Sequence, residues 1–139
     1  MVRTDKINKL EEIAEEENIP VMETECEKCG SISLLMGENC YIGIDSNSDE
    51  REYKERLAHE LGHCVQGAFY NRYSHYDVVS RHEAAADRWA IEELVPPDEL
   101  EEALAENLDN IYLLAERFDV SEDFMIKACK YYECYFEAI

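Results

Sequence analysis

The clearest chemical signal in the sequence is an H-E-x-x-H motif at residues 59–63. On a helix, His59 and His63 stand one turn apart on the same face, so both imidazoles can bind one Zn²⁺. Glu60 lies about 100° further round the helix than His59, and its carboxylate can reach a water on the metal without becoming a ligand. The motif therefore predicts zinc ligands at His59 and His63, with Glu60 as the general base.

A second acidic motif begins 20 residues after His63. A catalytic zinc site usually takes three protein ligands and leaves a fourth position open for water. Glu83 can supply the third ligand, and Asp87, one helical turn later, can accept a hydrogen bond from a ligand histidine. The alanines at positions 84–86 make this helix narrow, which allows close approach to the first helix. Together the motifs favour one Zn²⁺ held by His59, His63 and Glu83.

Independent signals predict the two helices that carry these ligands. Asp49 and Glu52 have the spacing of a capping box at a helix start. Four apolar residues then recur at a spacing of four, namely Tyr53, Leu57, Leu61 and Val65. The second helix is predicted from about His82 to Leu94, where Pro96-Pro97 ends it.

The flanking segments complete a predicted α+β fold that is mainly helical. An amphipathic helix is expected between Thr4, a possible N-cap, and the break at residues 18–20. Short apolar runs separated by turn residues predict a small antiparallel sheet. These runs are Val21-Met22, Ile32–Met36 and Cys40–Ile44. Three more helices are expected from Asp98 to Tyr135.

One domain is expected over residues 1–139, because neither a linker nor a repeat interrupts the pattern. The predicted helix and sheet occupy about residues 1–47, and the metal-binding helices occupy about residues 49–95. A C-terminal helical segment follows over about residues 98–139.

The chain has 13 basic and 33 acidic residues, and its formal net charge is -20. Such a field repels phosphate backbones, so direct nucleic-acid binding is not expected, whereas a basic protein partner is compatible with it. No run of about 18 apolar residues occurs, so no membrane span is expected. The charged first residues lack the apolar run of a secretory signal, which predicts a cytoplasmic location.

The six cysteines are expected to be free thiols, because the cytoplasm is reducing. Residues 26–29 form a C-x-x-C motif that could hold a structural zinc ion together with Cys40 and Cys64. No second C-x-x-C motif follows it. Free thiols are therefore the favoured interpretation, and metal binding by Cys26 and Cys29 stays open.

The connection between the metal helices is rich in side chains that can donate hydrogen bonds. One of them could stabilise the oxyanion of a tetrahedral intermediate. The candidates are Arg72, Tyr73, His75, Tyr76 and His82. The sequence does not choose among them, and packing could explain each one. Tyr73, His75 and Tyr76 are kept as possible oxyanion or substrate contacts.

The residue pattern of positions 111–130 is typical of a helix-turn-helix unit. The second helix of this unit would begin at Glu122-Asp123, and its only basic residues are Lys127 and Lys130. Because contacts to DNA phosphates need basic side chains, a helical scaffold or a surface that docks a repressor fits this segment better.

The two motifs resemble those of the ImmA/IrrE-type metallopeptidases, a gluzincin group. Leu57–His63 looks like the active-site motif of this family, and Glu83–Ala90 looks like its E-x-x-A-[ND]-x-[FW]-A segment. Residues 94–96 and 114–121 are similar to the segments that follow. Members often carry a second acid where this chain has Ala85, so Glu83 is the carboxylate placed to ligate.

This resemblance spans nearly the whole chain and implies a minimal gluzincin fold. It also implies a zinc endopeptidase that cleaves a helix-turn-helix repressor of a phage or mobile element. The alternative is a non-catalytic regulatory module that keeps the zinc and binds a transcription regulator.

Overall fold

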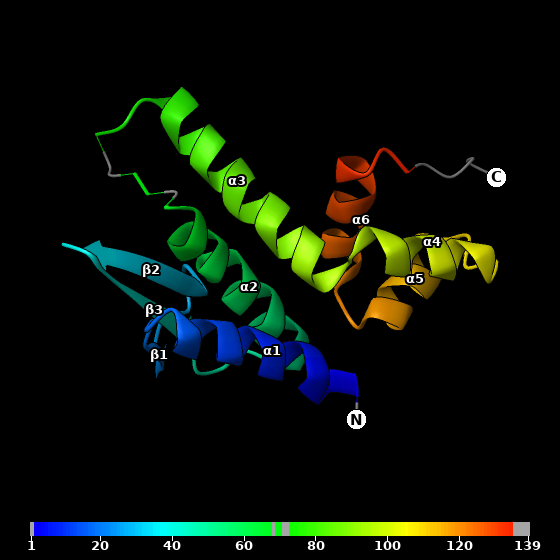
Figure 1. Cartoon of the computed structure of the whole chain (residues 1–139), viewed down its shortest axis with the longest axis horizontal. Coiled ribbons are helices and arrows are strands. Elements are labelled where there is room, and N and C mark those ends of the chain that lie inside the picture. The colour runs from blue at the N-terminus through cyan, green and yellow to red at the C-terminus, as the bar shows by residue number, and fades with distance from the viewer. Residues whose placement is uncertain (1, 68, 71–72, 135–139) are drawn as a thin grey trace.

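The computed structural model describes residues 2–67, 69–70 and 73–134. It consists of helices and a small sheet that lies at one side of the molecule (Figure 1). The helices are α1 (Val2–Glu16), α2 (Glu50–Gln66), α3 (Tyr76–Leu94), α4 (Pro97–Ala105), α5 (Ile111–Phe118) and α6 (Glu122–Tyr131). The mainly helical α+β class is therefore confirmed. None of the helices in this part of the chain has the length and apolar character that crossing a membrane would require.

The sheet has three strands in the order β1-β3-β2, with bounds Val21–Thr24 for β1, Ser31–Met36 for β2 and Asn39–Asp45 for β3. Strands β2 and β3 are antiparallel, but β1 pairs with β3 in parallel, so the expectation of an antiparallel sheet is wrong for β1. Ile42 and Ile44 of β3 are buried. The most buried strand therefore takes the central position, and the other two flank it.

Helix α2 lies between the sheet and α3 (Figure 1). Leu57 and Leu61 on α2 are fully buried, as are Leu10 of α1 and Ile44 of β3. These residues belong to one apolar core, which holds α2 on both sides. The helix that carries the H-E-x-x-H motif is thus the central element of the fold.

The start of α2 confirms the predicted capping box. The Asp49 carboxylate accepts a hydrogen bond from the Glu52 backbone N–H at 2.9 Å, and Glu52 Oε1 accepts one from the Asp49 N–H at 3.2 Å. At the N-terminus, α1 begins two residues before Thr4, so Thr4 lies within the helix and is not its cap. Helix α3 begins at Tyr76, six residues earlier than predicted. Residues 76–94 contain no glycine or proline that would stop the helix there.

The last three predicted helices are present, and α4 begins at Pro97. Asn110 caps α5 and Ser121 caps α6, each through a side-chain oxygen that accepts a backbone N–H. The short turn between them docks on α2, because Asp119 in this turn accepts a hydrogen bond from Arg51 Nε at 2.7 Å. The turn between α5 and α6 is therefore attached to the first turn of α2.

Four of the six cysteines are not free thiols in the structure. Cys26 is bonded to Cys29, and Cys40 is bonded to Cys64. Their Cα atoms are 5.7 Å and 6.1 Å apart, as disulfides require. The expectation of free thiols is wrong at these positions, because folding brings β3 against α2 and the 26–29 turn closes on itself. The sulfur atoms form two separate bonds rather than one tetrahedral metal site.

Candidate metal centre

Three predicted ligands meet between α2 and α3. The donor atoms offered by His59, His63 and Glu83 all lie within 4.8 Å of one another. His59 Nε2 is 3.2 Å from Glu83 Oε1, and His63 Nε2 is 2.7 Å from Glu83 Oε2. Two imidazole nitrogens and one carboxylate oxygen are one of the donor sets found in catalytic zinc sites. The geometry of the three residues fits a single metal ion.

Gly62 explains how α3 comes close enough to deliver Glu83. A Cβ atom at this position would lie 2.7 Å from the Ala86 carbonyl oxygen and 2.9 Å from Ala86 Cα. Ala58 and Ala86 are also fully buried at this contact. Small residues on both helices therefore let the two backbones touch, directly beside His63.

Asp87 lies behind His59, on the side away from the predicted metal. Its Oδ1 atom is 2.9 Å from His59 Nδ1 and 3.6 Å from Lys127 Nζ of α6. Burial acts to raise the pKa of Asp87, but the His59 hydrogen bond and the charge of Lys127 outweigh it and lower the pKa. The ionised carboxylate accepts the Nδ1 proton, so Nε2 of His59 is left to bind a metal.

The pKa of His59 responds to the same group of acids. Burial acts to lower it, but the hydrogen bond to Asp87 and the charges of Asp87, Glu60 and Glu83 raise it above its usual value. These carboxylates favour positive charge on or beside the ring. A metal ion would take the place of the extra proton at Nε2.

Glu60 lies beside the ligands and lines a cavity of about 380 Å³. Its side chain is 7% exposed and accepts a hydrogen bond from Ser31 Oγ of β2 at 2.8 Å. The cavity is lined by Cys29, Ser31, Ile32, Ser33, His59, Glu60, His63, Phe69, Tyr70 and Glu83. The predicted ligands and the predicted general base therefore face one shared space.

Tyr70 and Ser31 contact the site, although the sequence did not single them out. The Tyr70 hydroxyl donates to Glu83 Oε2 at 3.0 Å, and its ring stacks on His82 with centroids 6.4 Å apart. Burial and the Glu83 charge raise the pKa of Tyr70, so it stays a donor. The tyrosine-rich composition of the connection was the available signal, but the course of the loop decides which ring reaches the site.

The other candidates in this connection lie elsewhere. Tyr73 and Tyr76 are 79% and 82% exposed, and His75 is exposed at the N-cap of α3. None of these three is among the described residues that line the cavity. His82 approaches the site through Tyr70, and Arg72 lies outside the described residues.

A search of curated proteins finds no match to this chain. The family of IrrE N-terminal-like domains, Peptidase_M78, matches residues 13–130. This range includes both metal helices, the sheet and nearly all of α6. Members of this family are metal-dependent peptidases, which agrees with a His59, His63 and Glu83 site beside Glu60. The chain belongs to the Peptidase_M78 family of IrrE N-terminal-like domains.

Proposed function

We propose that this protein is a zinc-dependent endopeptidase. The observation that carries the proposal is the convergence of His59, His63 and Glu83 within 4.8 Å, in the cavity that Glu60 also lines. In this assignment, those three residues hold one Zn²⁺, Glu60 is the general base and Asp87 orients His59.

In this proposal, each group that faces the cavity has its own role in the reaction. When bound, Zn²⁺ supplies Lewis acidity that polarises a peptide carbonyl and lowers the pKa of a water toward about 7. Glu60 takes the proton from that water and passes it to the leaving amine. Ser31 holds the Glu60 carboxylate, and the Tyr70 hydroxyl beside Glu83 can donate to the developing oxyanion.

The edge of the sheet supports a peptide as the substrate. Strand β2 is terminal in the sheet order, and its residues Ile32 and Ser33 line the cavity. Leu34 and Met36 of the same strand are 50% and 61% exposed. An extended peptide can add to such an edge through backbone hydrogen bonds and place one of its bonds over the cavity.

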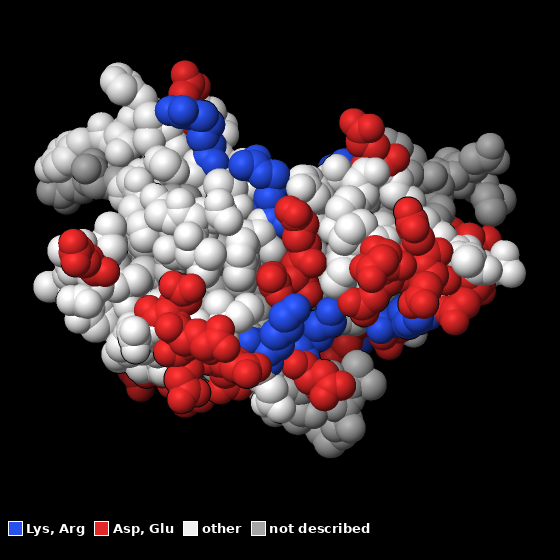
Figure 2. All heavy atoms as spheres, viewed as in Figure 1, with Lys and Arg blue, Asp and Glu red and all other residues white. Residues whose placement is uncertain are grey.

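The charge of the chain supports a basic partner, and we propose a helix-turn-helix repressor of a phage or mobile element. The formal net charge is -20, and acidic side chains form several groups on the face in Figure 2, with smaller basic groups between them. DNA-binding domains carry basic surfaces, so electrostatic attraction would speed their encounter with this protein. Such a substrate implies a cytoplasmic site of action.

Metal analysis followed by incubation with the repressor encoded beside the gene tests the proposal. We expect about one zinc per chain and defined repressor fragments in mass spectrometry. Glu60→Gln should retain zinc and abolish cleavage, whereas Glu12→Gln, an exposed acid on α1, should cleave normally. If Glu60→Gln still relieves repression in cells, the chain is instead a non-catalytic zinc-containing regulatory module.

A further inference from the structure

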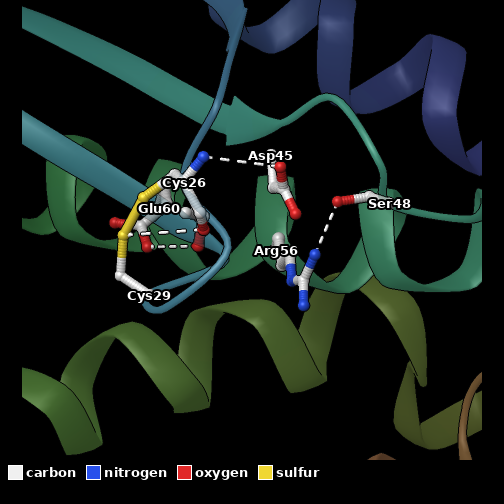
Figure 3. The surroundings of a disulfide bond; sticks show 7 residues. Cys26, Cys29, Asp45, Ser48, Arg56 and Glu60 are labelled. Carbon is white, nitrogen blue, oxygen red and sulfur yellow. Dashed lines mark hydrogen bonds between the residues drawn. A yellow bond between two sulfur atoms is a disulfide. The ribbon is translucent and has the colours of Figure 1, made fainter.

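The disulfide between Cys26 and Cys29 lies beside Glu60 (Figure 3). Cys29 is exposed and lines the same cavity as Glu60, while Cys26 is half-buried. The proposed mechanism uses neither sulfur atom. The pair is therefore a second reactive group at the rim of the candidate site.

The turn that contains these cysteines is connected to Glu60 by a short chain of contacts. Gly30 N–H donates to the Cys26 carbonyl at 2.7 Å, and Asp45 N–H donates to the Gly30 carbonyl at 2.8 Å. Gly30 has a positive φ of 78°, and a Cβ atom there would lie 2.8 Å from the Arg56 guanidinium. Ser31 follows directly and donates to Glu60. The shape of the turn thus fixes the start of β2 and the hydroxyl that holds Glu60.

The second disulfide has different surroundings. Cys40 and Cys64 are half-buried, pack against the apolar core and join β3 to α2 across 24 residues. Cys29, by contrast, is an exposed residue, and its disulfide partner Cys26 lies only three positions before it in the sequence. Thiol–disulfide exchange needs access to a sulfur atom, so small thiols can reach the exposed Cys29 more easily than the half-buried Cys40 and Cys64.

We propose that Cys26 and Cys29 form a redox-active pair that controls the position of Glu60 through Ser31, with the disulfide form as the more active state. The activity part of this inference rests on the proposed peptidase function. The oxidant is a low-molecular-weight disulfide such as glutathione disulfide. The Cys29 thiolate attacks it and releases one glutathione, and the Cys26 thiolate then displaces the second. The two cysteine protons end on the two glutathione thiols.

Reduction should lower the rate because it removes a constraint on the turn. The bond limits the conformations of residues 26–29, and the hydrogen bonds to Asp45 alone leave the turn more freedom. Ser31 would then hold Glu60 less firmly. A 1 Å misplacement of a catalytic group can cost about 100-fold in rate, and we expect a fall of roughly tenfold in kcat, with KM nearly unchanged.

The test equilibrates the zinc-loaded chain in buffers of different glutathione to glutathione disulfide ratio. Free thiols are then alkylated and counted by mass spectrometry, and zinc content and repressor cleavage are measured on the same samples. We expect the rate of repressor cleavage to rise with the fraction of chains in which Cys26 and Cys29 are bonded, while the zinc content stays constant. Cys40 and Cys64 should stay bonded at ratios that already reduce the first pair.

Matched variants separate the two disulfides. The double variant Cys26→Ser/Cys29→Ser should show the low rate in every buffer, while Cys40→Ala/Cys64→Ala should keep the response to glutathione. Ser31→Ala should have a low kcat, an unchanged KM and no response, because the link to Glu60 is lost. Ser31→Thr keeps the hydroxyl and should restore both the rate and the response.

Amide hydrogen exchange of residues 30–33, measured without substrate, tests the coupling independently of catalysis. We expect faster exchange there when the 26–29 pair is reduced. No cleavage in either redox state with zinc bound would contradict the peptidase function alone. Two results would overturn the redox proposal. The first is that reduction of this pair changes neither the amide exchange of residues 30–33 nor the cleavage rate. The second is that the cleavage rate changes with the oxidation state of Cys40 and Cys64 instead.

Discussion

Asp87 Oδ1 lies 2.9 Å from His59 Nδ1, so a carboxylate on α3 sets the ring orientation of a predicted metal ligand on α2. Lys127 of α6 approaches the same oxygen at 3.6 Å. Three helices thus meet behind one imidazole, and the carboxylate connects the metal site with the C-terminal part of the fold.

Asp87→Asn should weaken zinc binding by about 10- to 100-fold, because the neutral amide no longer favours the correct tautomer and positive charge at His59. Competition with a chromophoric chelator measures the affinity. Asp77→Asn removes an exposed acid from the same helix and should leave the affinity nearly unchanged. Equal affinities for the two variants would contradict the role of Asp87.

Removal of the metal should lower stability without unfolding the chain, because the apolar core that holds the helices and the sheet together does not include the three ligands. At a free zinc concentration 100 times the Kd, binding adds about 2.7 kcal/mol, which corresponds to a Tm rise of roughly 10 °C. Calorimetry with and without chelator measures the difference. Glu83→Gln should show little zinc response, whereas Glu92→Gln, an exposed acid on the same helix, should respond like the unaltered chain. A large and equal response in both variants would argue against Glu83 as a ligand.

Gly62→Ala should destabilise the protein by about 1–3 kcal/mol, because its Cβ would meet the Ala86 backbone at 2.7 Å. Separation of α2 and α3 would also carry Glu83 away from the histidines and weaken zinc binding. Urea unfolding and metal titration measure the two effects. Val65→Ala, at a 39% exposed position of α2, is the control and should change neither quantity much.

Asp119→Asn should make the free energy of unfolding less dependent on pH in the acidic range. Burial acts to raise the pKa of Asp119, but Arg51 and Lys54 outweigh it and lower the pKa in the folded state. The Asp119 contribution is therefore complete above the unfolded-state pKa of about 3.9 and is lost as the pH falls through the lower folded-state value. The backbone φ of 54° at this position is one that asparagine tolerates.

We expect Asp119→Asn to cost about 1–2 kcal/mol at pH 7, and the difference should shrink as the pH falls below about 4. Denaturant unfolding at several pH values measures the change. Asp109→Asn, at an exposed position, should follow the unaltered chain throughout. A deficit for Asp119→Asn that stays constant down to pH 2 would show that the ionised carboxylate is not the cause.

Local signals in the sequence determined the parts of the site that lie on one element. The spacing of His59 and His63 places them on one helical face, and the Asp49 capping box marks where that helix begins. The prolines at 96 and 97 end α3 at the predicted place. These features depend on contacts within a few residues of chain, so they can be predicted without knowledge of the fold.

Only the tertiary structure decided which groups reach the ligands from other elements. The approach of Glu83 depends on the Gly62 contact, and Tyr70 and Ser31 arrive from a loop and a strand edge. The parallel pairing of β1 and the cysteine pairing likewise depend on packing between distant segments. Because a loop's course and a strand's partner are set by the energy of the whole core, local spacing does not contain this information.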